Sequence, residues 1–426
     1  KPAKSCQSAA FTSRSITPIP AASTASSSMS TDKQVRRLLV ALLLCGLAIG
    51  QSLAAPARVG VMTMQPGGIF WERFGHNAIV IDNGERMTSY NFGFFDPGEA
   101  DFTANFIKGR MNYLLAALPL EQDLSYYRQA GRGVSIQWLD LDEAQRDAVA
   151  KRLAYLEKPE NARYRYDYFT NNCATQVRDV IDEALGGQLH RQMSASSLGN
   201  SYRSESVRLA WPARWMAMGF DLGMNAKADR PLSRWQDAFI PMRLQDSLDE
   251  IRLANGQPLV KTTQQLLPDT LKPPPAELPQ WSLSALCIGL VLGGTFYLAN
   301  RHLPRVFNAM ALAYGALCGL IGTVLLVIWL GTEHHFVHGN ANLLLFSPLS
   351  WLALVLYFIR HRSIAGQRAF TLSIMILAGM AVLAVALRLL DADSQHNLNW
   401  ILMALPAHWI ISRSLLRRTD PKPLFK

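Results

Sequence analysis

The chain has 426 residues, of which 49% are apolar and 17% are charged, and its formal net charge is +10. A typical soluble protein has a larger charged fraction, and this length allows one large domain or two to three ordinary ones. Apolar residues concentrate in the last third, and many basic residues lie at the edges of apolar segments, where they orient a chain in a bilayer. The composition therefore argues against nucleic-acid binding and predicts a water-soluble region joined to a membrane region.

Residues 29–55 have the three parts of an export signal. A basic stretch precedes the apolar run "LLVALLLCGLAIG", and the small residues of "QSLAAPA" follow it. This order predicts a signal peptide that is cleaved near Ala54 or Ala55, with an uncleaved anchor helix as the alternative. Residues 1–28 are rich in Ser and Ala, and we expect a non-native or disordered leader there.

Residues 56–255 are expected to form a globular α+β domain. Four segments rich in β-branched, aromatic and alternating residues predict strands, namely "ARVGVMTM", "HNAIVIDN", "GERMTSYNFGFFD" and "GVSIQWLDL". Two segments predict amphipathic helices: "DEAQRDAVAKRLAYLEK", and "ATQVRDVIDEAL" with two glycines after it. Residues 256–280 contain "LLPDTLKPPPAELPQ", which has the composition of a stiff, extended linker.

Five apolar segments follow, and we expect them to form a five-helix transmembrane domain over residues 281–416. They cover roughly 281–299, 307–330, 343–359, 370–390 and 397–416, each near the roughly 20 residues that a spanning helix needs. Basic loops alternate with loops that contain no Lys or Arg. The positive-inside rule places the basic loops and the basic tail, residues 417–426, in the cytoplasm and the globular domain outside.

The cysteines single out one residue of the expected exported domain. The five are Cys6, Cys45, Cys173, Cys287 and Cys318. The first two lie in the leader and the signal peptide, and the last two lie in apolar segments. Cys173 therefore has no intramolecular disulfide partner, and a lone thiol in an oxidising compartment is either paired between molecules or free and reactive. A buried structural cysteine is the alternative.

The position of Cys173 favours a reactive thiol. It stands at the start of a predicted helix, with Asn171 or Asn172 as the N-cap. Backbone N–H groups and the helix dipole stabilise a thiolate there, which lowers the thiol pKa. The same N–H groups can form an oxyanion hole when the thiolate attacks a carbonyl. The pattern predicts a nucleophile at the N-terminus of a helix.

A thiolate nucleophile needs a base, and the globular domain has two histidines. His190 follows the far end of the helix, whereas His76 begins a strand that can pack against that helix. We therefore predict His76 as the base. The side chain that orients its ring should be polar and lie on the neighbouring strand, and Asn91 is our choice. The other candidates are Glu72, Asp82 and Asp96.

Three motifs in this order resemble a known family. They are "WERFGHNAIVID", "YNFGFFDPGEADFTANFIKGRMNYLLAALP" and "YRYDYFTNNCATQVRDVID". They are similar to the periplasmic domain of the Lnb family of bacterial lipoprotein N-acyltransferases, and the five-segment tail with "HHFVHGNANLLLFSPL" matches that family's architecture. The resemblance implies a circularly permuted papain-like cysteine fold with His76 and Cys173 as the catalytic pair. This chain has Asn171 where the family commonly has an acidic residue, so no ionic role is expected there.

The resemblance also implies an activity and a location. The expected reaction moves a fatty acyl chain from a membrane phospholipid, through a thioester on Cys173, to the α-amine of the N-terminal diacylglyceryl-cysteine of exported lipoproteins. The backbone amide of Cys173, with Asn172, would stabilise the oxyanion. No cofactor or metal is expected. The protein would lie in a bacterial inner membrane, with its globular domain in the periplasm and its C-terminus in the cytoplasm.

Two other classes of function are compatible with the sequence. The first is a membrane-tethered cysteine hydrolase that cleaves phospholipids or cell-wall peptides, because one fold can support several chemistries. The second is a non-catalytic envelope assembly factor that uses the exported domain for binding.

The predicted outer loop "GTEHHFVHGNANLLLF" is a second concentration of polar residues. Sequence alone indicates an interfacial loop, and the spacing of its histidines fits no zinc-site pattern. The resemblance implies that the loop contacts a lipid headgroup or supports the active site. Its polar residues are Glu333, His334, His335, His338, Asn340 and Asn342.

Overall fold

A seven-stranded antiparallel sheet organises the first part of the described chain. The computed structural model describes residues 58–95, 98, 101–391 and 393–419, which belong to one compact unit. The expected leader, the signal peptide, Asp96 and residues 420–426 lie outside the described residues. The strand order is β6-β4-β3-β2-β1-β5-β7. The strands are β1 Arg58–Met64, β2 His76–Asp82, β3 Met87–Phe94, β4 Asn112–Pro119, β5 Val134–Leu139, β6 Arg163–Arg165 and β7 Val260–Leu267.

All four segments expected as strands form strands, namely β1, β2, β3 and β5, whereas β4, β6 and β7 were not predicted. Strand β7 falls within residues 256–280, which we expected to be a linker, and it pairs with β5. Most of its residues are exposed, and its sequence VKTTQQLL is largely polar because it forms an edge of the sheet. The apolar alternation that reveals a half-buried strand is therefore absent.

Both segments expected as helices form helices, α4 and α5. Helix α4 begins at a capping box between Asp142 and Gln145, and α5 begins at a similar box described below. The helices and short 3-10 segments (η) before the membrane region are η1 Phe70–Glu72, α2 Phe102–Lys108, α3 Leu120–Ala130, α4 Glu143–Leu156, α5 Cys173–Ala184, α6 Gln188–Ser194, α7 Tyr202–Ala210, α8 Arg214–Gly223, η2 Ala226–Asp229, α9 Arg234–Asp237 and α10 Pro241–Glu250.

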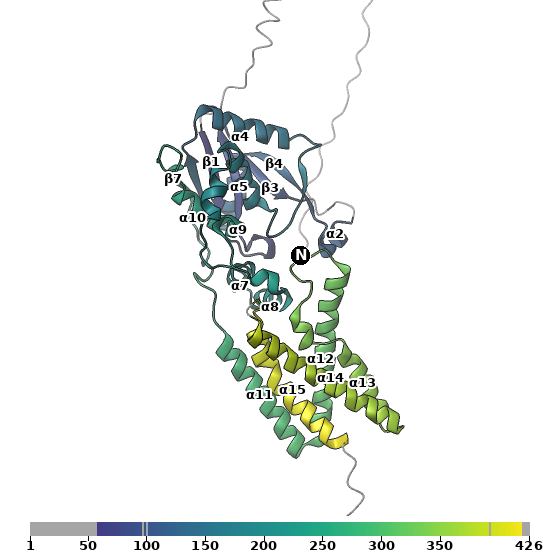
Figure 1. The fold of residues 1–426 in the computed structure, drawn as a ribbon. Coiled ribbons are helices and arrows are strands. Elements are labelled where there is room, and N and C mark those ends of the chain that lie inside the picture. The colour runs from purple at the N-terminus through teal and green to yellow at the C-terminus, as the bar shows by residue number, and fades with distance from the viewer. Residues whose placement is uncertain (1–57, 96–97, 99–100, 392, 420–426) are drawn as a thin grey trace, which may run out of the picture. The chain divides into compact units, whose positions relative to one another are not determined.

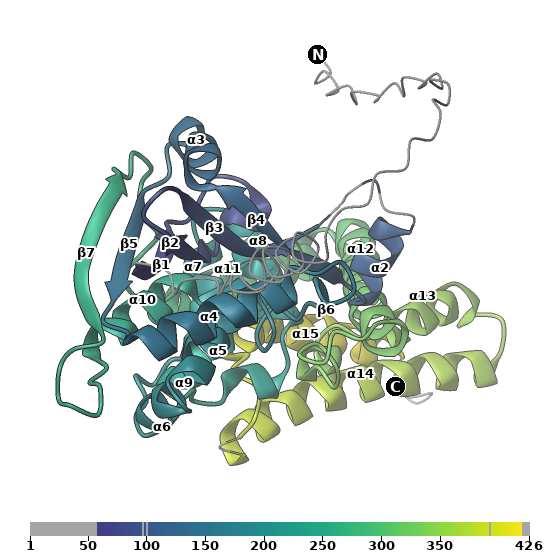
Figure 2. The ribbon, with the colours of Figure 1, turned by 90° about the horizontal axis from the view of Figure 1, so that it is seen from above.

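Helices cover both faces of the sheet, as the view in Figure 2 shows. Val177 of α5 packs in one core cluster with Ile79 of β2, and α4 contributes to the same cluster. Leu124 of α3 packs in a second cluster with Ala78 and Val80 of β2. Because successive side chains of a strand point to opposite faces, β2 divides its apolar residues between these two clusters. The sheet is thus the middle layer between α3 and the α4–α5 pair.

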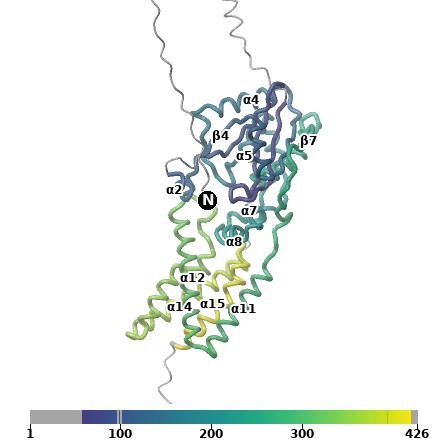
Figure 3. The backbone as a smooth tube through the Cα atoms, turned by 180° about the vertical axis from the view of Figure 1, so that it is seen from behind, coloured from purple at the N-terminus to yellow at the C-terminus, as the bar shows by residue number. Residues whose placement is uncertain are grey.

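Long apolar helices follow the sheet domain and run alongside one another (Figures 1 and 3). Among the described residues, four helices are long and apolar enough to cross a membrane: Ser282–His302, Pro304–Gly331, Ala341–Ile359 and Ile364–Leu390. The elements of this region are α11 Ser282–His302, α12 Pro304–Gly331, η3 Ala341–Leu344, α13 Leu349–Ile359, α14 Ile364–Leu390 and α15 Leu398–Thr419.

The fifth expected span, 397–416, forms helix α15 but falls outside these four. Its apolar run is interrupted by Pro406, His408 and Arg413. Helix α15 nevertheless packs closely against α11 and α14. In the described structure, helices therefore form in all five expected segments, and the last segment is less apolar than the others.

Two glycines one turn apart allow the close approach of α11 and α15. A Cβ atom at Gly293 would lie 2.9 Å from Cβ of Pro406, and one at Gly289 would collide with the carbonyl oxygen of Leu402. Small residues at this spacing let helix backbones approach closely in membranes, where dispersion contacts replace the hydrophobic effect as the source of association. Gly294, by contrast, has open space at its Cβ position.

We predict opposite effects for the substitutions Gly293→Ala and Gly294→Ala. The Gly294 change should leave the protein as stable or up to about 1 kcal/mol more stable, because alanine favours a helix. The Gly293 change should destabilise it by about 1–3 kcal/mol, the usual cost of overpacking a filled interface. Unfolding titrations in detergent micelles measure both. Equal effects at the two positions would show that the Gly293 contact with α15 contributes nothing.

Candidate active site

Cys173 is the first residue of helix α5, and Asn172 is the N-cap. Asn172 Oδ1 accepts a hydrogen bond from the backbone N–H of Thr175 at 3.0 Å, and Thr175 Oγ1 accepts one from the backbone N–H of Asn172 at 2.7 Å. This reciprocal pair fixes the start of the helix. The buried Cys173 therefore lies at the positive end of the helix dipole.

His76 is the first residue of β2, and its ring interacts with Cys173 through charge and a hydrogen bond. Asn91 of β3 pairs with Ala78, so the side chain of Asn91 points to the same face of the sheet as those of Ala78 and His76. His76 Nε2 lies 3.1 Å from Asn91 Oδ1. Because Nε2 is engaged with Asn91, Nδ1 is the ring nitrogen left for Cys173. The structure thus brings Cys173, His76 and Asn91 together.

The buried carboxylate of Asp123 continues this chain of contacts. Asn91 Nδ2 donates to Asp123 Oδ2 at 2.9 Å, and Ser89 Oγ donates to the same oxygen at 2.7 Å. A carboxylate accepts but does not donate, so Asp123 fixes the amide of Asn91 with its oxygen toward His76. Asp123 was not among the residues predicted from the sequence, because the pattern around it did not predict α3. The available signal was an acidic residue within the amphipathic segment LEQDLSYYRQA.

The electrostatic environment favours a thiolate–imidazolium pair. Burial opposes ionisation of Cys173, but the charge of His76, a hydrogen bond from His76 and the backbone N–H groups of Asn77 and Ala174 outweigh it and lower the pKa of the thiol. Burial also disfavours a charged His76, yet Cys173, with a smaller contribution from Asp123, raises the pKa of the imidazole. Each partner therefore stabilises the charged form of the other.

The surroundings of the sulfur supply hydrogen-bond donors, and a residue without a side chain lies on the neighbouring strand. The N–H groups of Asn77 and Ala174 point at Cys173. Donors that stabilise a thiolate can also stabilise an oxyanion that forms beside it. Gly93, at φ 95°, presents no side chain on the neighbouring strand, and a Cβ there would lie 3.9 Å from Cβ of Cys173. The arrangement can therefore support attack of the thiolate on a carbonyl.

The remaining candidates from the globular domain have other contacts. Asn172 uses its side chain as the N-cap and also donates to the carbonyl oxygen of Phe239 at 2.9 Å. Glu72 accepts from the hydroxyl of Tyr126, and Asp82 forms an ion pair with Arg58 at 2.7 Å, at the opposite end of β2 from His76. The ring of His190, on α6 beyond the far end of α5, packs edge-on against Trp235 at 4.7 Å.

The predicted outer loop contacts the segment that leads into Cys173. The ring of His334 stacks on Tyr168, with centroids 5.8 Å apart, and Phe336 packs against Phe169 at 4.7 Å. Glu333 accepts from Arg110 at 2.5 Å and also from Arg165. The loop thus lies against residues 165–169, a few positions before the thiol.

Other residues of the loop bind helix α8 and the turn after it. Asn340 and Asn342 both donate to the carbonyl oxygen of Leu222 at 2.8 Å. They thus supply hydrogen-bond donors to a backbone carbonyl near the C-terminal end of α8, where the helix itself provides none. Asn225 donates to the backbone carbonyls of His335 and His338 at 3.0 and 2.6 Å. Among the described residues, no group of three or more His, Cys, Asp or Glu side chains is arranged to hold a metal ion.

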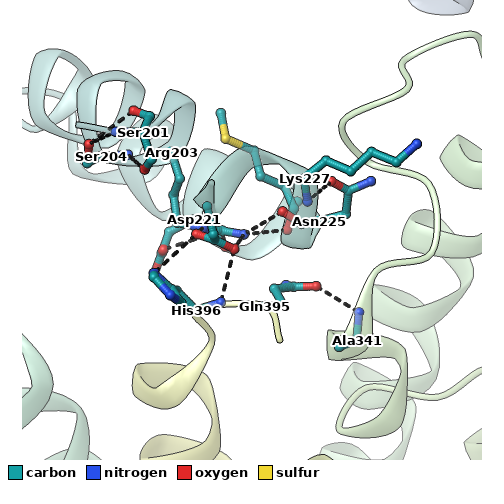
Figure 4. Close-up of polar contacts among 12 residues, drawn as sticks. Ser201, Arg203, Ser204, Asp221, Asn225, Lys227, Ala341, Gln395 and His396 are labelled. Carbon is teal, nitrogen blue, oxygen red and sulfur yellow. Dashed lines mark hydrogen bonds and ion pairs between the residues drawn. The ribbon is translucent and has the colours of Figure 1, made fainter. Parts of the chain in front are cut away.

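A buried polar network joins α7 and α8 to the ends of the membrane helices (Figure 4). Arg203 of α7 donates to the carboxylate of Asp229 at 2.6 Å, and the backbone N–H of His396 donates to the same carboxylate at 3.0 Å. Gln395 accepts from the backbone N–H of Ala341 at 2.8 Å. The segment before α15, the outer loop and the globular domain are therefore connected by hydrogen bonds.

Comparison with family models gives two matches. Residues 50–208 match the model described as the Lnb N-terminal periplasmic domain, and residues 279–390 match the Lnb transmembrane domain. A search of curated proteins and a search of solved structures each found no match. The two matched regions include Cys173, His76, Asn91, Asp123 and the outer loop, and they cover more than half of the sequence. The chain therefore belongs to the Lnb family, as a membrane protein with a periplasmic N-terminal domain.

Proposed function

We propose that this protein is a lipoprotein N-acyltransferase that uses Cys173 as its nucleophile. The observation that carries the proposal is the contact of a thiol at a helix N-terminus with His76, whose other ring nitrogen faces Asn91. A nucleophile, a base and a group that orients the base are the parts that acyl transfer requires. Membership of the Lnb family supports lipid-linked substrates at a membrane.

In the first half-reaction, the Cys173 thiolate attacks an ester carbonyl carbon of a phospholipid. The N–H groups of Asn77 and Ala174 stabilise the oxyanion of the tetrahedral intermediate. The carbon–oxygen ester bond then breaks, and the His76 imidazolium gives its proton to the departing alkoxide of the lysophospholipid. The acyl chain remains on Cys173 as a thioester.

In the second half-reaction, the α-amine of a diacylglyceryl-modified lipoprotein attacks the thioester. His76, neutral after the first step, accepts a proton from the amine as the carbon–nitrogen bond forms. The carbon–sulfur bond breaks, which restores the thiolate beside an imidazolium. Asn91, held by Asp123, keeps the ring of His76 in place in both steps.

We infer a papain-like arrangement of circularly permuted order, because the histidine strand and the asparagine strand precede the cysteine helix in the chain. We further propose that α15 is a fifth span, which puts the C-terminus in the cytoplasm and the globular domain in the periplasm of a bacterial inner membrane. Basic loops at "NRHLPR" and "RHRSIAGQR", and loops without Lys or Arg on the other side, support this topology.

The test of the proposed function is mass spectrometry of the N-terminal peptide of a reporter lipoprotein. The cells contain this protein as their only candidate N-acylase, either as wild type or as Cys173→Ala at equal abundance. We expect an added acyl mass with wild type and a free amine with the variant, because no thioester can form without the sulfur.

Each other result contradicts a stated part of the proposal. A free amine with both proteins overturns acyl transfer, and free fatty acid or cleaved cell-wall peptides would then indicate a hydrolase. Acylation with both proteins shows that Cys173 is not the nucleophile.

A second prediction concerns the pH dependence of thiol alkylation. The thiolate is the form that reacts with iodoacetamide, so the lowered pKa predicts half-maximal labelling of Cys173 at a lower pH than for an ordinary thiol. In His76→Ala the stabilising charge is lost while burial remains, and the midpoint should move to higher pH. Peptide mass spectrometry of the Cys173 peptide measures the labelling.

The matched control is His190→Ala, which removes the other histidine of the globular domain and should leave the midpoint unchanged. If the midpoint for His76→Ala equals that of the wild type, the thiolate–imidazolium pair is not present in the protein.

A further inference from the structure

The loop before His76 carries a group of exposed aromatic side chains. The side chain of Trp71 is 63% exposed, and Ile69 and Phe70 are also exposed. Phe70 stacks on Trp215 of α8, with ring centroids 6.4 Å apart, and Trp215 is 72% exposed. Tryptophan is rarely exposed to this extent in water, so a contiguous group of this kind calls for a partner. We call Ile69, Phe70, Trp71 and Trp215 the aromatic patch.

The loop is folded so that its acidic side chain is buried while its apolar ones are exposed. Glu72 is buried, accepts a hydrogen bond from Tyr126 and lies 3.5 Å from the buried guanidinium of Arg132. The backbone N–H groups of Gly67 and Gly75 donate to the carbonyl oxygen of Glu72 at 2.9 and 3.0 Å. These contacts hold the loop in a fixed turn with Phe70 and Trp71 outward, so their exposure is a built feature of the fold.

Helix α8 connects the patch to the membrane region. Phe220, on α8, packs edge-on against Phe74 of the same loop at 5.9 Å. Met218 and Leu222 of α8 belong instead to the core cluster that includes Trp281 and Trp400, at the starts of α11 and α15. Asp221 accepts from the indole N–H of Trp400 at 3.1 Å. One helix therefore touches both the patch loop and the ends of the apolar helices.

Because α8 contacts both the patch loop and the ends of the apolar helices, the membrane surface is the partner that the patch fits. Trp215 and Leu222 are seven residues apart on α8, about 10 Å along its axis, so Trp215 lies two helical turns from the residue that packs with Trp281 and Trp400. Aromatic side chains concentrate at this level of a bilayer, where the polar headgroups begin. Arg214, next to Trp215, is exposed and stacks on Trp211 at 4.0 Å, which adds a positive charge suited to lipid phosphates.

We propose that the aromatic patch inserts into the outer surface of the phospholipid bilayer. The patch loop ends at His76, so insertion places the Cys173–His76 pair beside the lipid, on the side from which an acyl chain can approach. The insertion does not depend on the proposed acyl transfer, and it can be measured in a protein that performs no reaction.

The test uses the full chain in bilayer nanodiscs made of phosphatidylcholine that carries bromine on one acyl chain near the headgroup, or of the same lipid without bromine. Bromine quenches tryptophan fluorescence only at short range. The double variant Trp71→Phe/Trp215→Phe keeps the apolar surface, and subtracting its emission from that of the wild type isolates these two indoles. We expect most of this difference emission to be lost in the brominated bilayer.

The matched control is Trp235→Phe, because Trp235 packs against His190 and under Arg178 in the globular domain. Its difference emission should be the same in both bilayers. The other tryptophans, including those in the membrane helices, should be quenched equally in all variants, which verifies folding. If the emission of Trp71 and Trp215 is unaffected by bromine, the proposal is overturned. A change in that emission only on raising the protein concentration or adding a lipoprotein would assign the patch to a protein partner instead.

Discussion

The contact between the first residue of α5 and the first residue of β2 is the interaction on which the proposed chemistry depends. Cys173 and His76 each make the other's charged form more stable, and for both groups the partner's charge is the largest contribution that opposes the effect of burial on the pKa. The N-cap at Asn172 positions the sulfur, and the Asn91–Asp123 pair positions the ring. These supports come from one helix start, one neighbouring strand and one helix on the opposite face of the sheet, so the site requires the whole layered fold.

A second constraint joins this site to the membrane region. The outer loop packs against residues 165–169 just before the thiol, and its asparagines donate hydrogen bonds to a backbone carbonyl at the C-terminal end of α8. The globular domain is therefore tied to the membrane helices by buried polar contacts as well as by the chain that connects them. For an acyl transferase with two lipid-linked substrates, these contacts would hold the nucleophile near the bilayer, which lowers the entropic cost of bringing the reacting groups together.

The sequence predicted those features that local chemistry determines. Cys173 at a helix start, His76 at a strand start and Asn91 on the adjacent strand could be derived from capping residues, strand patterns and a count of thiols and imidazoles. Asp123 and β7 could not be. Asp123 joins the candidate site through contacts with Asn91 and Ser89, 32 and 34 residues away along the chain, and β7 gains its structure from pairing with β5 rather than from its own polar sequence. The outer loop was expected to contact a lipid headgroup or to support the active site, but its sequence did not reveal that the backbone carbonyls of His335 and His338 accept hydrogen bonds from Asn225.

A thioester mechanism is tested by looking for an acyl group on the sulfur of Cys173. The purified protein in phospholipid nanodiscs, without any lipoprotein acceptor, would be digested, and the peptide containing Cys173 would be analysed by mass spectrometry. We expect an added acyl mass on Cys173 that neutral hydroxylamine removes, as it does from a thioester. An unmodified thiol under these conditions, from protein that acylates a lipoprotein once the acceptor is added, would contradict a thioester intermediate on Cys173.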